Sequence, residues 1–366
     1  MLAIAEPAEA PHGPPPATSG LWTQTDAQIT LASARIALPR VAATVRFTET
    51  GESSHQGDGL DNMVQYRSPD GAVFATAFLY YPGLPDAALQ EFASGEQIRA
   101  GGGPVTLGQP RIVAAGGIDR VAIVRDYAHY RGNLASTGAF IKAGRWIVGL
   151  RVSGPETRRA EVDATMVALL QGIRFEGEAR PRPAELLELG DCPASVAPSA
   201  HLLSDDGSRN AAMALIATFD GAGEQARDAA ARGTTILPAR VGSRWCVSTR
   251  AHIGSSTLPI LRAVAPLRAG TIDGDSLVAV PLNDAGTLLE VVRSRDHDLV
   301  ILLYHDIGRT TLLGTYDGPP SDEQIANILS GADEPGTRIR AVVNLRPGQG
   351  ADVQIGGLSN NAPPRN

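Results

Sequence analysis

The sequence has almost no lysine, because Lys142 is the only one among its 32 lysine and arginine residues. Chemistry that depends on a lysine amine could therefore rest only on this residue. Positive charge is also in deficit, with 39 acidic residues and a formal net charge of −7. Nucleic acids and anionic membrane surfaces both select clustered positive charge, so we expect no nucleic-acid partner and no membrane-surface binding.

Long hydrophobic runs are missing as well. No apolar stretch approaches the roughly 18 residues of a membrane-spanning helix, so we expect no membrane span. At the N-terminus, Met1–Ala5 is apolar and Ala8-Glu9-Ala10 fits a small-x-small cleavage pattern, but a charged start and most of an apolar core are absent. Residues 1–20 are therefore either a signal-peptide remnant or a disordered tail. We expect a periplasmic or secreted protein, with the cytoplasm as the alternative.

Cysteine is scarce, with only Cys192 and Cys246 in the chain. Two isolated cysteines of a cytosolic protein are usually buried thiols, whereas an even count in an exported protein suggests a disulfide. A disulfide across the 54 residues that separate them would add about 3–4 kcal/mol to the free energy of unfolding on the chain-entropy model. We expect the disulfide if the protein is exported. No histidine lies at the short spacing that would complete a zinc site with these cysteines.

The length of 366 residues favours two domains, since single cores rarely grow beyond about 250 residues. Proline, alanine and glycine dominate residues 1–20, and a second proline-rich stretch covers residues 177–200. We interpret the first stretch as a tail and the second as a linker. The predicted domains are then residues 21–176 and 201–356, followed by a disordered tail at residues 357–366.

The first half has strong strand patterns. Residues 73–80 alternate between two largely apolar sets of side chains, which predicts a strand buried on both faces. Ser68–Gly71, just before it, has the composition of a type I turn. Short glycine turns separate the next three predicted strands, so they should pair antiparallel; these are residues 120–130, 134–141 and 145–153.

A helix should follow the last of these strands. Ser153 and Glu156 have the spacing of a capping box, Pro155 suits the first turn, and Gly172 suits a left-handed stop. Between them lies an apolar stripe at helical spacing; its members are Val162, Met166, Leu169 and Leu170. Residues 173–175 then return as a short edge strand.

The second half repeats this order. Three predicted strands, residues 287–293, 299–305 and 310–316, precede a helix with a Ser321/Gln324 capping box and a Gly331 stop, and a strand at residues 338–345 follows. The sequence thus predicts an α+β protein of two domains, each a mainly antiparallel sheet packed against one or two helices. Divergent duplication is a hypothesis, because a competing match aligns Arg145-Trp146-Ile147-Val148 with Arg244-Trp245-Cys246-Val247.

Several tempting sites fail on geometry or position. His297-Asp298 and His305-Asp306 could be metal ligands, but an extended run between them would separate the histidines by roughly 26 Å. Asp273-Gly274-Asp275 starts like a calcium loop but lacks the required glycine and terminal glutamate. Gly254-Ser255-Ser256 is not a nucleophile elbow. We therefore predict no catalytic, cofactor-binding or metal-binding residues, and no cofactor.

One predicted strand carries a small cluster of polar residues. Tyr127 and His129 should share one face of the strand at residues 120–130, and Asp126 and Tyr130 the other. The usual explanation is a polar pair on a half-exposed sheet. If the protein has a cleft, we nevertheless expect it first near this strand or near Trp146 and Trp245, whose indole N–H groups need partners.

The first half resembles the PsbP-like modules over about residues 29–176. The resemblance rests on the Leu38-Pro39 entry strand, the Tyr66–Gly71 hairpin and the closing strand-helix-strand from Trp146 to Phe175. It implies a small α-on-antiparallel-sheet domain of the kind found in exported proteins. That family is mostly non-enzymatic, so the resemblance implies an assembly or accessory role and carries over no catalytic residues.

Two functional hypotheses follow. The preferred one is a non-enzymatic, exported, periplasmic-type accessory or interaction protein whose partner is another protein. The alternative is a hydrolase or small-molecule-binding protein with a site between the two domains, where clefts often form. A pocket that holds several titratable groups with perturbed ionisation would favour the alternative.

Overall fold

The computed structural model describes residues 20–54, 58–101, 103–177, 179–192, 199–204, 244–254, 256–264, 274–294, 299–333, 335–349 and 351–355. Apart from Gly20, the predicted tails at residues 1–20 and 357–366 lie outside these ranges. The described chain forms two compact units. The first unit comprises residues 7–187 together with 281–287, and the second unit comprises residues 188–280 and 288–366. Among the described residues, no helix is long and apolar enough to cross a membrane.

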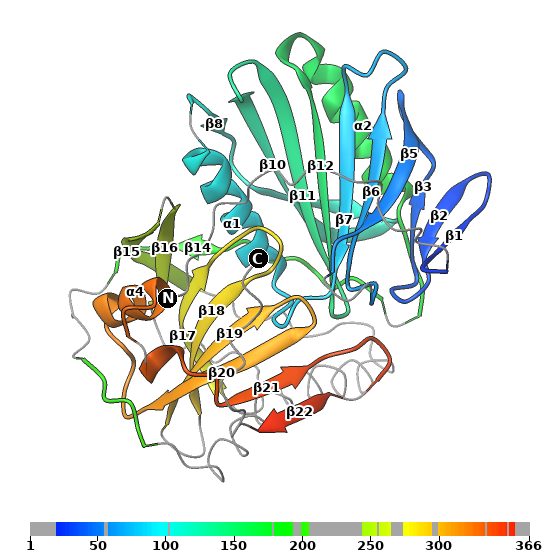
Figure 1. Ribbon diagram of the computed structural model, residues 1–366. Coiled ribbons are helices and arrows are strands. Elements are labelled where there is room, and N and C mark those ends of the chain that lie inside the picture. The colour runs from blue at the N-terminus through cyan, green and yellow to red at the C-terminus, as the bar shows by residue number, and fades with distance from the viewer. Residues whose placement is uncertain are drawn as a thin grey trace. The chain divides into compact units, whose positions relative to one another are not determined.

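The first unit contains a small antiparallel sheet and a large one (Figure 1). The small sheet has the order β1-β2-β3-β13, and the large sheet has the order β4-β5-β6-β7-β12-β11-β10-β8, with β9 also paired to β10. The strands of the small sheet are β1 (Trp22–Gln24), β2 (Gln28–Leu31), β3 (Ile36–Pro39) and β13 (Arg174–Phe175). The strands of the large sheet are β4 (Val41–Ala42), β5 (Val45–Glu52), β6 (Asp61–Arg67), β7 (Phe74–Tyr80), β8 (Thr106–Leu107), β9 (Arg111–Ala115), β10 (Ile118–Tyr130), β11 (Leu134–Ala143) and β12 (Trp146–Pro155).

Helix α2 (Arg159–Gly172) packs on one face of the large sheet through the predicted apolar stripe, which is buried. The predicted capping box is wrong, because β12 continues to Pro155 and the Ser153 hydroxyl lies 2.8 Å from that of Ser136. A 3-10 turn (η1, Glu156–Arg158) precedes the helix instead. The predicted left-handed stop at Gly172 is also wrong, because Gly172 is helical and the helix ends in extended backbone at Ile173. The small size of Gly172 matters instead, because a Cβ there would lie 2.6 Å from Pro39.

Helix α1 (Ala87–Ala100) packs on β10 and β11 and was not predicted from the sequence. Asp86 caps it by accepting hydrogen bonds from the amides of Ala88 and Leu89. The helix has no apolar stripe at helical spacing, because its buried side includes Gln90, Glu91 and Ser94. A periodicity search therefore could not detect it.

The prediction for residues 73–80 is partly wrong. The strand β7 exists, and the turn before it closes with a hydrogen bond from the Gly71 amide to the Ser68 carbonyl. However, only the set on the α2 side of the sheet is buried throughout, since Tyr80 alone is buried in the opposite set. On the opposite side, Phe74 and Phe78 are 38% and 39% exposed. Burial on both faces fails because α1 covers β10 and β11 but not β7.

The second unit is built on one sheet in the order β14-β15-β16-β17-β18-β19-β20-β21-β22, antiparallel except for the β14–β15 pair. Its strands are β14 (Glu188–Leu189), β15 (Arg244–Ile253), β16 (Ser256–Ala263), β17 (Gly274–Pro281), β18 (Leu288–Ser294), β19 (Val300–Asp306), β20 (Arg309–Tyr316), β21 (Ala341–Asn344) and β22 (Asp352–Ile355). Helix α4 (Asp322–Ser330) packs against β15, and a 3-10 turn (η3, Pro335–Thr337) follows it. The Ser321/Gln324 capping box is confirmed, and Gly331 ends α4 in the left-handed conformation at φ 74°.

The α+β class with two sheet-and-helix units is confirmed. Both units contain the predicted order of three strands, helix and strand, but in the second unit an unpredicted strand, β22, follows, and the strands after the two helices pair differently. In the first unit β13 joins β3 in the small sheet, whereas in the second unit β21 pairs with β20 in the large sheet. Duplication therefore stays a hypothesis that rests on element order.

The stretch predicted as a linker, residues 177–200, makes contacts in both units. The Arg180 carbonyl accepts a hydrogen bond from Gly144, and the Ala184 amide donates to the Arg120 carbonyl, so both contacts lie within the first unit. Further along, β14 pairs with β15 in the second sheet. The compact units divide between residues 187 and 188.

Candidate functional site

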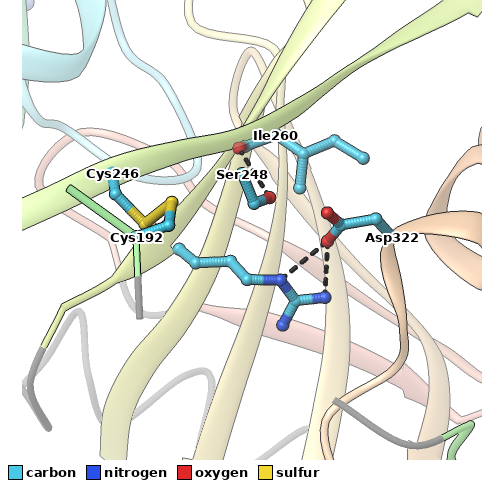
Figure 2. The surroundings of a disulfide bond; sticks show 6 residues. Cys192, Cys246, Ser248, Ile260 and Asp322 are labelled. Carbon is cyan, nitrogen blue, oxygen red and sulfur yellow. Dashed lines mark hydrogen bonds and ion pairs between the residues drawn. A yellow bond between two sulfur atoms is a disulfide. The ribbon is translucent and has the colours of Figure 1, made fainter. Parts of the chain in front are cut away.

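The two cysteines form the disulfide that the sequence suggested, with an S–S distance of 2.03 Å (Figure 2). Cys246 is fully buried in β15, and the bond ties this strand to the chain that follows β14. Close by, the guanidinium of Arg262 in β16 donates from Nε to Asp322 at 2.7 Å. This contact links the sheet to the first turn of α4, so the region is a structural brace of the second unit.

The two His-Asp pairs were rejected as metal ligands because the chain between them was predicted to be extended, and the described part of it is a strand. His305 lies in the extended strand β19, and His297-Asp298 lies outside the described residues. His305 contacts Glu290 at 2.9 Å through Nε2 and Thr310 at 3.0 Å through Nδ1. This chain of hydrogen bonds resembles a nucleophile-base-acid triad. However, the three residues are 4%, 8% and 3% exposed, which leaves no space for a substrate at the hydroxyl.

Other sequence candidates are also placed. Within the described ranges, no three His, Cys, Asp or Glu residues are grouped so that they could hold a metal ion. Asp273 lies outside the described residues, and Gly274 opens β17. Gly254 occupies the turn between β15 and β16, at φ 59°, and Ser255 lies outside the described residues.

The prediction that Tyr127 and His129 share a face is wrong. The pairing of β10 with β11 shifts register between Tyr127 and Tyr130, and His129 has a φ of 59°. A bulge of this kind breaks the alternation of side chains along a strand. Tyr127 is buried, and its burial raises its pKa to about 12, whereas Asp126 makes an ion pair with Arg111.

The candidate site that the structure adds lies on the side of the large sheet that carries α1. Residues directly opposite one another in antiparallel strands share a face, so the pairings of β6, β7, β12, β11 and β10 define rows across it. One row is Gln65, Thr76, Arg151, Gly138 and Arg125, and the next is Met63, Phe78, Gly149, Phe140 and Ile123. Helix α1 covers the β10–β11 end of these rows. We call the uncovered part of these rows (Met63, Gln65, Thr76 and Phe78), together with Phe74 on the same side of β7, the open face.

A depression of about 150 Å³ adjoins the open face. Its lining includes Gly138 and Gly149, which have no side chains to fill the floor, and the ring of Phe140 lies 3.4 Å from the place of a Gly149 Cβ. The remaining lining residues are Asp61, Phe74, Thr76, Phe78, Tyr80, Leu150, Arg151, Asp284 and Ala285. The last two belong to the segment 281–287 of this unit. The depression is thus mainly apolar, with four aromatic residues, one threonine, one arginine and the two carboxylates of Asp61 and Asp284.

Arg151 is the cationic group of the depression. Its Nη2 donates to the Ser94 hydroxyl at 2.7 Å and lies 3.4 Å from the Asp284 carboxylate. Both contacts use the same nitrogen. Within the described residues, Nε and Nη1 make no hydrogen bond, and they carry three of the five N–H donors of an arginine. Thr76 lies directly opposite Arg151 on β7. Its hydroxyl likewise makes no hydrogen bond among the described residues.

Behind Arg151, an ion pair holds α1 on the sheet. Glu91 in α1 pairs with Arg125 in β10, with a hydrogen bond from Nη2 to Oε2 of 3.1 Å. Burial raises the pKa of Glu91 above its usual value, and the neighbouring Arg125 only partly offsets this effect. Burial also raises the pKa of Tyr80, at the edge of the depression, and the nearby Asp284 and Asp61 add to the rise. Tyr80 donates a hydrogen bond to the Asp284 carbonyl at 3.2 Å.

Comparison with known proteins adds no assignment. No protein-family model matches the chain, and no curated protein matches it in sequence. The candidate site was not found from the sequence because its parts come from distant segments. The one local signal was Phe-x-x-x-Phe at residues 74 and 78, which a buried strand would show equally.

Proposed function

We propose that this chain is a non-enzymatic, exported accessory protein that binds a segment of another polypeptide on the open face of the first unit. The observation that carries the proposal is the exposure of Phe74 and Phe78, each more than a third exposed on one side of β7. Exposed aromatic side chains that lie together are enriched at protein interfaces and depleted elsewhere on protein surfaces.

The surroundings have the anatomy of an interface. Met63 and Gln65 of β6 lie beside the two rings and are half-buried, while the charged residues Arg67 and Glu49 at the margin are exposed. An apolar centre with a polar rim is the arrangement seen in protein–protein contacts. The depression supports a polypeptide over a metabolite, because drug-sized ligands occupy cavities of about 300–1,000 Å³.

The disulfide supports the exported location. All cysteine of the chain is in the Cys192–Cys246 bond, and such bonds persist in oxidising compartments such as the periplasm and the extracellular space. Periplasmic or secreted placement is therefore part of the proposal. Fractionation of the source cells would test it, and recovery of the full chain in the cytosol with reduced thiols would contradict it.

Photo-crosslinking in intact cells tests the binding role. A p-benzoylphenylalanine at position 78 should give a defined adduct with one polypeptide, and Phe74→Ser in the same chain should lower its yield. The matched control places the crosslinker at Val167, which is 50% exposed on α2, on the opposite side of the sheet. Equal adduct patterns from positions 78 and 167, or a yield that Phe74→Ser leaves unchanged, would overturn the proposal.

A further inference from the structure

We infer that the depression beside Phe78 receives a carboxylate side chain of the bound polypeptide segment, with Arg151 as its anchor. This inference rests on the proposed function and adds the chemistry that the site selects. It starts from Nε and Nη1 of Arg151, which make no hydrogen bond among the described residues.

The position of Arg151 prepares it for an acceptor. Its Nη2 donates a hydrogen bond to the Ser94 hydroxyl of α1, and this contact fixes the orientation of the guanidinium. Its side chain is 26% exposed, and Gly138 stands opposite on β11 without a side chain to cover it. A fixed, planar guanidinium with free N–H groups matches a carboxylate better than a flexible ammonium does.

Asp284 contacts Arg151 but leaves Nε and Nη1 of the guanidinium available for a ligand. Its carboxylate lies 3.4 Å from Nη2, and its side chain is 36% exposed, so the pair is a weak surface contact. An incoming carboxylate can accept a hydrogen bond from Nη1 while Nη2 keeps Ser94. The negative charge of Asp284 should then lower the affinity for the incoming carboxylate, because like charges repel.

The aromatic lining defines the rest of the ligand. Phe74, Phe78 and Phe140 surround the polar centre, and Thr76 adds one hydroxyl that can donate to the second carboxylate oxygen. A glutamate or aspartate flanked by large apolar residues fits this combination. A fully polar acidic stretch would leave the rings in water, and an apolar stretch would leave the guanidinium donors without an acceptor.

Two labelled peptides test the inference on the full-length protein by fluorescence anisotropy. The first has the sequence Gly-Ser-Phe-Glu-Phe-Ser-Gly, and the second has glutamine in place of glutamate. We expect the glutamate peptide to bind about tenfold more tightly, as loss of one charge-assisted hydrogen bond implies. Equal affinities for the two peptides would overturn the inference.

Variants of the anchor separate charge from folding. Arg151→Met should abolish the preference for glutamate, whereas Arg151→Lys should retain part of it. Asp284→Asn should tighten binding of the glutamate peptide about threefold, as expected for a partly exposed charge pair. Thermal unfolding monitors the fold of each variant. A preference that persists in Arg151→Met, or a glutamate affinity that falls in Asp284→Asn, would contradict the assignment.

A third set of measurements distinguishes a polypeptide carboxylate from a free organic acid. It also distinguishes failure of the carboxylate anchor from failure of the binding role. If 3-phenylpropionate competes as strongly as the glutamate peptide, the ligand is a free organic acid, and the polypeptide source is wrong. If crosslinking at position 78 persists unchanged in Arg151→Met, the binding role stands and the carboxylate anchor fails. If neither peptide binds and no adduct forms at position 78, both proposals fail.

Discussion

The two faces of the large sheet in the first unit are covered by helices of different character. Helix α2 buries Val162, Met166, Leu169 and Leu170 against one face, which stabilises the unit by removing apolar surface from water. Helix α1 also buries apolar side chains against the other face, but it adds the Glu91–Arg125 ion pair and leaves part of that face uncovered. The first face is thus closed by apolar packing, whereas the second is the face on which we propose the binding role.

The α2 face should give the largest loss of stability. Leu169 is fully buried, so Leu169→Ala should lower the free energy of unfolding by about 3 kcal/mol through lost burial and the cavity left behind. Urea denaturation of the wild type and the variant would measure this difference. A loss below about 1 kcal/mol would break the comparison, because it would mean that the α2 contact is not what stabilises the unit.

The α1 face should respond to charge instead. Glu91→Ala leaves the Arg125 guanidinium without its carboxylate, and the side chain of Arg125 is only 16% exposed. We expect a loss of about 2 kcal/mol, below the range for a fully buried pair because Arg125 keeps some water contact. Glu91→Gln keeps the shape and should cost less. Glu96→Gln is the control, because it removes from the same helix a carboxylate that pairs with the exposed Arg99 and not with a buried arginine.

The same residue gives a pH dependence with a definite sign. The pKa of Glu91 is raised above its ordinary value of 4.5 in the folded protein, so the fold holds this proton more tightly than the unfolded chain does. Its contribution therefore favours folding below pH 4.5 and is lost as the pH rises through the raised pKa. The slope of stability against pH over this window should be smaller in Glu91→Gln, as denaturation at a series of pH values would show.

The smallest effect belongs to the open face. Phe78→Ala should change the free energy of unfolding by less than about 1 kcal/mol, because its ring is already 39% exposed. The neighbouring Leu79 points to the other side and is fully buried, so Leu79→Ala should cost about 2–5 kcal/mol. Calorimetry on this pair would sharpen the comparison within a single strand. Equal losses would show that the open face contributes to stability after all.

Much of the framework was predictable because its signals are local. The stripe of α2, the meander β18–β19–β20 and the capping box of α4 each depend on spacings within a few residues of one another. Predictions failed where tertiary contacts override a local signal. Ser153 and Glu156 have the spacing of a cap, but the pairing of Ser153 with Ser136 extends β12 through that position.

The sequence by itself determined the α+β class, the two sheet-and-helix units and a cysteine pair able to form one disulfide, since hydrophobic periodicity and cysteine number are properties of the chain. Only the tertiary structure decided which side of β7 stays open. That side depends on where α1 packs. Helix α1 has no apolar stripe in its sequence from which its position could be predicted. The row of Thr76, Arg151 and Gly138 likewise exists only once strand register brings distant segments together.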